Sequence, residues 1–180
     1  VGVSDDGDQE WKAGLPGGGL YDTAPHPAYL ARGFVGKIRD VQVMARRSDD
    51  GTLQEIRTLV DGERCTGTVT ISLQARPLMN RVMVYGTAQT AEINLNNMTL
   101  IVRQTRKVPK IVGKVLPNLE EAWQLVQATV VNGVGFITGK QRYYPGMGVH
   151  FRQMYQALAA GQAPPVSAEE GRDVMALLQA

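Results

Sequence analysis

The sequence has few of the residues that build disulfides and metal centres. Its 180 residues include one cysteine, Cys65, and two histidines, His26 and His150. A single cysteine cannot form an internal disulfide, and these three residues cannot assemble a structural zinc site of Cys and His ligands. We therefore expect neither a disulfide nor a bound metal in this chain.

Long uncharged apolar runs are also absent. Charged residues interrupt each apolar stretch well before the roughly 20 residues that a membrane span needs, and no signal-like segment opens the chain. The 19 basic and 17 acidic residues nearly cancel, for a net charge of +2, and they are interspersed. This balance lacks the basic patch typical of nucleic-acid binding. We expect a cytoplasmic protein that binds neither membranes nor nucleic acids.

The composition that is present, 43% hydrophobic and 20% charged, is ordinary for a globular protein. A chain of this size supports one complete core, which predicts a single domain over residues 1–180. The chain opens with Val1-Gly2-Val3 and no methionine. We expect a fragment whose first three residues are the end of a strand.

The hydrophobic period changes along the chain from helical to alternating and back. It predicts a helix at 25–34 ended by Gly36, and later helices that start at Asn118, at about 147 and after Ser167. Between them it predicts strands at 39–46, 68–75, 81–85, 90–95 and 99–104. Short turns join several of these strands, which makes them antiparallel neighbours. The predicted class is α+β, a mostly antiparallel sheet with helices packed on one face and an open face available for oligomerisation.

Two patterns that suggest anion or nucleotide binding are weak on inspection. The basic connection 103–117 is either an anion patch or a solvated loop, and we favour the loop. The glycines of 133–139 and of 14–19 do not follow a strand as a dinucleotide fingerprint requires, and the third glycine of the first set is one residue late. We expect no cofactor-binding residues in this chain, and structural roles for Cys65 and His150.

The segment with most chemical content joins three glycines to Asp22 and His26. On a helical turn, residues four apart share a face, and a carboxylate can orient an imidazole for proton transfer. Alternatively, Asp22 or Thr23 merely caps the following helix and His26 is an ordinary polar residue at its start. Spacing alone leaves both interpretations open.

The run Gly18-Gly19-Leu20-Tyr21-Asp22 with His26 resembles the Gly-Gly-x-x-Asp-x-Gly-x-His signature of the glucose-fructose oxidoreductase, inositol dehydrogenase and rhizopine-catabolism (Gfo/Idh/MocA) family. The turn at 85–87, the strands to Gln104 and the segment 144–167 resemble the C-terminal domain of that family in the same order. The sequence departs from the signature at Ala24, which replaces a glycine, and at Tyr29, where an acidic residue is common.

The resemblance implies a two-domain oxidoreductase whose N-terminal Rossmann domain, absent from this chain, binds NAD or NADP. It also implies that Asp22 and His26 lie beside the nicotinamide and work with a lysine of the nucleotide domain. The expected substrate is a sugar, cyclitol or related polyol, and the expected assembly is a homo-oligomer formed through the sheet face. The fragment alone would be inactive. The alternative is a non-catalytic assembly or carbohydrate-binding module.

Overall fold

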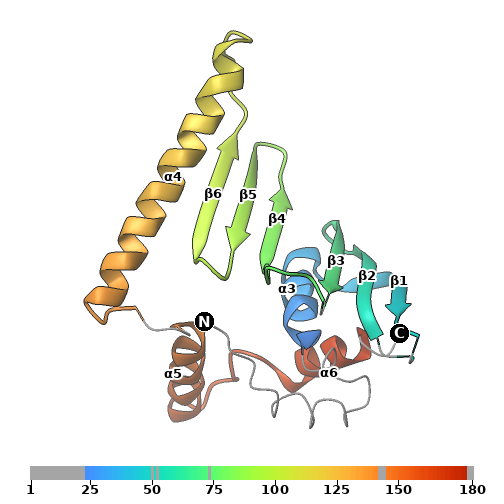
Figure 1. Ribbon diagram of the computed structural model, residues 1–180. Coiled ribbons are helices and arrows are strands. Elements are labelled where there is room, and N and C mark those ends of the chain that lie inside the picture. Colours follow the sequence, from blue (N-terminus) through green and yellow to red (C-terminus); the bar gives the residue numbers. More distant parts are fainter. Residues whose placement is uncertain (1–22, 50, 52, 73, 142–144, 178–180) are drawn as a thin grey trace. The chain divides into compact units, whose positions relative to one another are not determined.

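The computed structural model describes residues 23–49, 51, 53–72, 74–141 and 145–177. The described residues form two compact units (Figure 1). One contains the residues up to Ala75 together with those from Gln156 onward, and the other is Arg76–Tyr155.

The first unit is a three-stranded antiparallel sheet, sheet A, with two helices. Its elements are α3 (Pro25–Val35), β1 (Ile38–Arg47), β2 (Leu53–Gly62), β3 (Thr66–Ser72) and α6 (Ala168–Leu177). The strand order is β1-β2-β3, and both pairings are antiparallel. Helix α3 packs against β2 and β3, and α6 packs against α3.

The core of the first unit lies between α3 and one face of sheet A. Val60 of β2 is only 3% exposed and shares that face with its register partner Gly67. Val35, at the end of α3, is buried above them and lies close to Gly67. Alternation along β2 puts Leu59 on the opposite face, where it is exposed.

The second unit contains sheet B and a long helix. Its elements are β4 (Arg81–Tyr85), β5 (Gln89–Asn94), β6 (Thr99–Gln104) and α4 (Val112–Ile137), and α5 (Pro145–Ala159) contains the boundary between the units. The strand order is β4-β5-β6, again fully antiparallel. Helix α4 runs along β6, the last strand of the sheet (Figure 1).

Charged side chains connect the three strands of sheet B to α4. Glu92 of β5 accepts hydrogen bonds from Arg81 of β4 at 3.2 Å and from Arg103 of β6 at 2.9 Å. Arg103 also forms a two-point ion pair with Glu121 of α4. The side of α4 that contacts β6 is therefore polar.

The α+β class and the antiparallel pairing predicted from sequence are confirmed. The predicted helices at 25–34 and about 147–160 correspond to α3 and α5, and the predicted strands at 81–85 and 99–104 have the bounds of β4 and β6. The strand β2 was not predicted, and the expected strand at Val1–Val3 lies outside the described residues.

The predicted start of α4 was wrong. The helix begins at Val112 instead of Asn118, so the supposed loop 103–117 contains its first turns. Pro117 lies inside the helix, where its ring removes a bond to the carbonyl of Gly113. Gly113 is exposed in the first turn, where water can replace that bond. Asn118 donates from Nδ2 to the carbonyl of Lys114 at 3.4 Å and does not cap the helix.

Candidate functional site

Helix α3 is fixed at its C-terminal end by a close approach of backbone. A Cβ added to Gly62 of β2 would lie 2.5 Å from both Cβ and the carbonyl oxygen of Val35, so only glycine leaves room there. The helix ends at Gly36, whose φ of 80° suits glycine. Arg64 then donates its backbone N–H to the carbonyl of Val35 at 2.9 Å, which joins the end of α3 to the β2–β3 turn.

A second anchor joins α3 to α6. Arg32 donates from Nη1 to Oε1 of Glu170 at 3.1 Å. Glu170 is also the last residue of a capping box, because its Oε2 accepts from the N–H of Ser167 at 3.0 Å and its own N–H donates to Oγ of Ser167 at 3.1 Å. The hydrogen bond from the Ser167 backbone, followed by that from Arg32, lowers the pKa of Glu170 below its ordinary value. The helix expected after Ser167 is thus confirmed as α6.

The outward face of α3 carries His26. Its buried side consists of Ala24, Ala28 and Val35, whereas His26, Tyr29, Leu30 and Phe34 are exposed on the other side. Spacings of three, four and eight residues from His26 put this set on one helical face. The anchored helix thus presents an imidazole beside two aromatic rings and a leucine.

Of the two candidate catalytic residues, only His26 is described. It is the second residue of α3, and among the described residues its imidazole forms no hydrogen bond or ion pair. Asp22 lies outside the described residues. The N-cap position of α3 belongs to Ala24.

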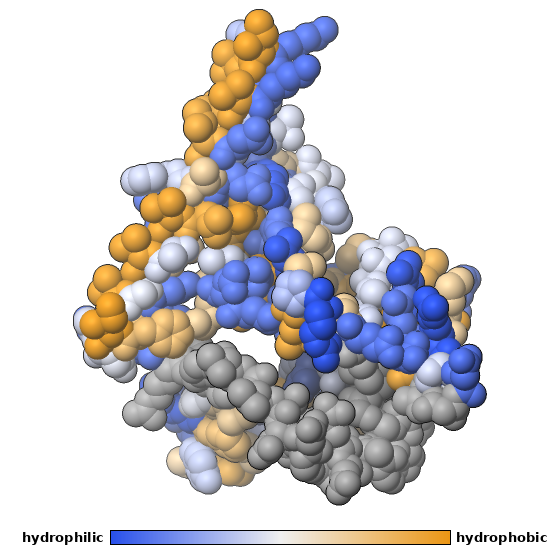
Figure 2. Space-filling model, viewed as in Figure 1, coloured by the Kyte–Doolittle hydropathy of each residue, from blue (hydrophilic) through white to orange (hydrophobic). Residues whose placement is uncertain are grey.

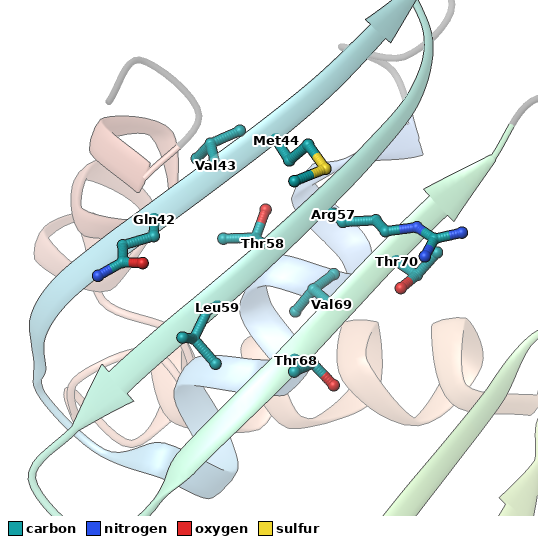
Figure 3. A pocket seen from close by; sticks show the side chains of 9 residues that line it. All are labelled: Gln42, Val43, Met44, Arg57, Thr58, Leu59, Thr68, Val69 and Thr70. Carbon is teal, nitrogen blue, oxygen red and sulfur yellow. The ribbon is translucent and has the colours of Figure 1, made fainter.

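The face of sheet A opposite α3 has a shallow hollow of about 530 Å³ (Figure 3). Two cross-strand rows of side chains line it, Gln42–Leu59–Thr68 and Met44–Arg57–Thr70. Met44 is 73% exposed, and no described helix packs on this face. The hollow combines hydroxyl, amide and guanidinium groups with exposed aliphatic surface.

The remaining candidates occupy separate places in the fold. Gly133 and Gly135 lie within α4, which agrees with the rejection of a dinucleotide fingerprint there. Cys65 is exposed, and its Sγ lies 3.9 Å from the carbonyl oxygen of Phe34. His150 lies in α5, away from His26 in the chain. In the part of the chain that the structure describes, no three His, Cys, Asp or Glu side chains gather as a metal site would require.

Neither sheet has the geometry of a dinucleotide site. Such sites lie at the carboxyl ends of parallel strands in βαβ units, and every strand pair among the described residues is antiparallel. No described helix combines the length and the apolar sequence needed to cross a membrane, and α4, the longest, contains Lys114, Glu120 and Glu121.

Sequence reasoning missed the residues that hold α3 in place. Gly62 and Gly67 flank the β2–β3 turn, and paired glycines at strand ends are a recognisable signal of close backbone approach. The Arg32–Glu170 contact joins residues 138 apart in the chain, and no local pattern indicates it.

Comparison with known proteins identifies the family. The profile described as the GFO/IDH/MocA C-terminal domain matches residues 2–92, half of the chain, and the chain therefore belongs to the Gfo/Idh/MocA family. This confirms the resemblance seen in the sequence. No curated protein sequence matches significantly.

Solved structures share the fold at low identity. UDP-N-acetylglucosamine 3-dehydrogenase GnnA from Acidithiobacillus ferrooxidans has a TM-score of 0.64 and 13% identity, over 97% of this chain and 48% of that one. An oxidoreductase from Thermotoga maritima has a TM-score of 0.58 and 18% identity, and the match covers 98% of this chain and 46% of that one. The WlbA dehydrogenase from Bordetella pertussis, solved with NADH and UDP-GlcNAcA, has a TM-score of 0.55 and 16% identity, over 89% and 43%. The chain thus spans less than half the length of these relatives.

Proposed function

We propose that this chain is the substrate-facing domain of a cytoplasmic, nicotinamide-dependent dehydrogenase that acts on a sugar, cyclitol or related polyol hydroxyl. The observation that carries the proposal is the placement of His26 on the outward face of α3, at the point where the family signature has its histidine. The opposite side of α3 is buried, so the imidazole is held by a fixed helix and is open to a ligand.

In this proposal His26 takes the proton of the substrate hydroxyl during oxidation and returns it during reduction. Histidine suits this role because its ordinary pKa lies near neutral pH. Asp22 would orient the imidazole or bind a substrate hydroxyl. Tyr29 and Phe34, exposed on the same face, offer ring surfaces on which the apolar face of a sugar ring can stack.

The relatives narrow the substrate class that we propose. GnnA is named as a UDP-N-acetylglucosamine 3-dehydrogenase, and WlbA was solved with NADH and UDP-GlcNAcA. A sugar nucleotide is therefore our first candidate within the polyol class.

The cofactor, NAD or NADP, would be bound outside this chain, since the described strands are all antiparallel. When bound, it would accept and return the hydride. The 180-residue chain alone is then expected to be inactive and to show no tight NAD binding by calorimetry. Micromolar affinity would contradict this part of the proposal.

The test of the catalytic role is His26→Ala, and the more conservative His26→Gln, in a longer protein that includes the nucleotide-binding half. Loss of a positioned general acid–base is expected to lower kcat by about 10²- to 10⁴-fold. The matched control is His150→Ala, at the other histidine of the chain, with kcat unchanged. Unchanged turnover in both His26 variants, with assembly intact, would instead favour the non-catalytic assembly module.

We also propose that copies pair through the open face of sheet A. Met44 and Leu59 are exposed on that face, where an aspartate would prevent close packing of two copies. Leu59→Asp is expected to weaken self-association by at least tenfold in sedimentation velocity, whereas Thr87→Asp, in the exposed turn between β4 and β5, should not change it. Equal association of all three proteins would contradict pairing through this face.

A further inference from the structure

Helix α4 exposes a continuous apolar stripe on the side away from its sheet. Eight residues form this stripe, all between 43% and 88% exposed: Val112, Val115, Leu119, Trp123, Val126, Val130, Val134 and Ile137. None is charged. Figure 2 shows the stripe as an orange band along α4.

The opposite side of the helix is the polar one, and it contacts sheet B. Gln124 and Glu121 bind β6, and Asn132 donates from Nδ2 to the carbonyl of Met98 at 2.9 Å, in the turn before β6. No residue of α4 is buried. An amphipathic helix normally turns its apolar side inward, so the arrangement of α4 indicates that something else covers its stripe.

The size of the stripe fits a stable protein interface. Typical monomers expose apolar patches of about 300–600 Å² at most. Eight aliphatic and aromatic side chains, each about half exposed or more, approach the roughly 800 Å² that each partner contributes to a standard interface. Along the helix the stripe spans about 38 Å at the ordinary helical rise.

The spacing of the stripe is symmetric about its centre. Successive positions are 3, 4, 4, 3, 4, 4 and 3 residues apart, and this order reads the same in both directions. Reversing one helix against another therefore sets each apolar position opposite an apolar position: Val112 opposite Ile137, Val115 opposite Val134, Leu119 opposite Val130, and Trp123 opposite Val126. In three of these four pairs a larger side chain meets a valine, as close packing of two helices favours.

We propose that the α4 stripe binds the α4 stripe of a second copy of this chain, antiparallel, with the two-fold axis between Gln124 and Leu125. Such a contact is isologous, because both copies use the same surface and each residue pair therefore occurs twice. In a parallel pair each residue would instead face its own copy, so that Trp123 would meet Trp123 and no larger side chain would be paired with a valine. This contact is separate from sheet A, which belongs to the other compact unit.

Cysteine cross-linking tests both the contact and its direction. In a Cys65→Ser background, a Leu119→Cys chain is mixed with a Val130→Cys chain and oxidised mildly. The antiparallel pair predicts a mixed covalent dimer, and little cross-linking of Leu119→Cys with itself. Self cross-linking of Leu119→Cys in excess of the mixed dimer, or no cross-linking at all, would overturn the proposal.

Neighbouring valines supply a matched pair of variants for the association itself. Val130 lies in the stripe and is 59% exposed, whereas Val131 is 67% exposed and about 100° further around the helix. In a Leu59→Asp background, which removes pairing through sheet A, Val130→Asp is expected to raise the dimer dissociation constant in sedimentation velocity by at least tenfold, and Val131→Asp to leave it within threefold. Equal effects, or a wild-type chain that stays monomeric at 100 µM, would overturn the proposal. Leu59→Asp should leave the Leu119–Val130 cross-link unchanged. Loss of that cross-link in the Leu59→Asp chain would show that the α4 contact depends on sheet A, and would also overturn the proposal.

Discussion

The side-chain amide of Gln124 pairs with the backbone of Val102 in the way that a neighbouring strand would. Oε1 of Gln124 accepts from the N–H of Val102 at 2.8 Å, and Nε2 donates to the carbonyl of Val102 at 3.0 Å. Val102 lies on β6, the last strand of sheet B, so both groups would otherwise face outward without a strand partner. The helix thereby protects a sheet edge, which in an open sheet is a site of unwanted pairing.

Gln124→Ala is expected to destabilise the chain by about 1–3 kcal/mol, since it removes two hydrogen bonds worth about 0.5–1.5 kcal/mol each. Urea unfolding measures the change. Gln127→Ala is the control, because Gln127 is exposed on the same helix and its side chain forms no hydrogen bond among the described residues. A loss of stability as large in the control as in Gln124→Ala would show that helix propensity, not the edge contact, is responsible.

Local alternation was sufficient to predict most of the strands. Residues 81–85 and 99–104 alternate between two faces and are bounded by turn residues, and the structure has strands with these bounds. The same signal was present but not used in β2, where Ile56, Thr58 and Val60 share one face. The start of α4 is hard to predict because proline usually breaks a helix, whereas the bond that Pro117 removes concerns a carbonyl in an exposed first turn.

The candidate site could be predicted only in part. The family signature pointed to His26, and the hydrophobic period predicted the helix on which His26 lies. Which side of α3 faces outward depends on Val35 meeting Gly62 and Gly67, contacts that join distant parts of the chain. The polar inner side of α4 was equally hidden, because the apolar period of a helix normally marks its buried side.

Gly62→Ala is expected to destabilise the first unit by about 1–3 kcal/mol, the usual cost of overpacking. The added Cβ would meet the carbonyl oxygen of Val35, a backbone atom that cannot move aside without moving the end of α3. Gly33→Ala, within α3 and with nothing within 4 Å of the added Cβ, should instead stabilise by about 0.5–1 kcal/mol. Thermal melts followed by circular dichroism compare the two. Opposite signs support the close approach, and a neutral Gly62→Ala would refute it.

Glu170→Gln is expected to lower the melting temperature at neutral pH, and this difference should vanish in acid. The pKa of Glu170 is lowered in the folded chain by the Ser167 backbone and Arg32, from an ordinary value of 4.5. A carboxyl group of this kind stabilises the fold above about pH 4.5, and the contribution is lost as the pH falls through the lowered value.

Melting curves between pH 7 and pH 2.5 measure this difference. Glu169→Gln is the matched control, since Glu169 lies in the same first turn and forms only a long, exposed contact of 3.5 Å with Arg172. The control should track the wild type throughout. If the gap between Glu170→Gln and the wild type were the same at pH 2.5 as at pH 7, the ion pair would not be its source.

Arg103→Lys is expected to destabilise the second unit by about 1 kcal/mol, more than the same change at Arg81. Both arginines bind Glu92, but Arg103 also holds Glu121 through two nitrogen atoms, a geometry that the single ammonium group of lysine cannot reproduce. These hydrogen bonds to Glu121 and Glu92 raise the pKa of Arg103. Because part of the interaction is electrostatic, the difference between the two variants should narrow in 1 M NaCl, where charges are screened within about 3 Å. Equal losses in urea unfolding at low salt would mean that the two-point pair with Glu121 adds nothing to the stability of the sheet.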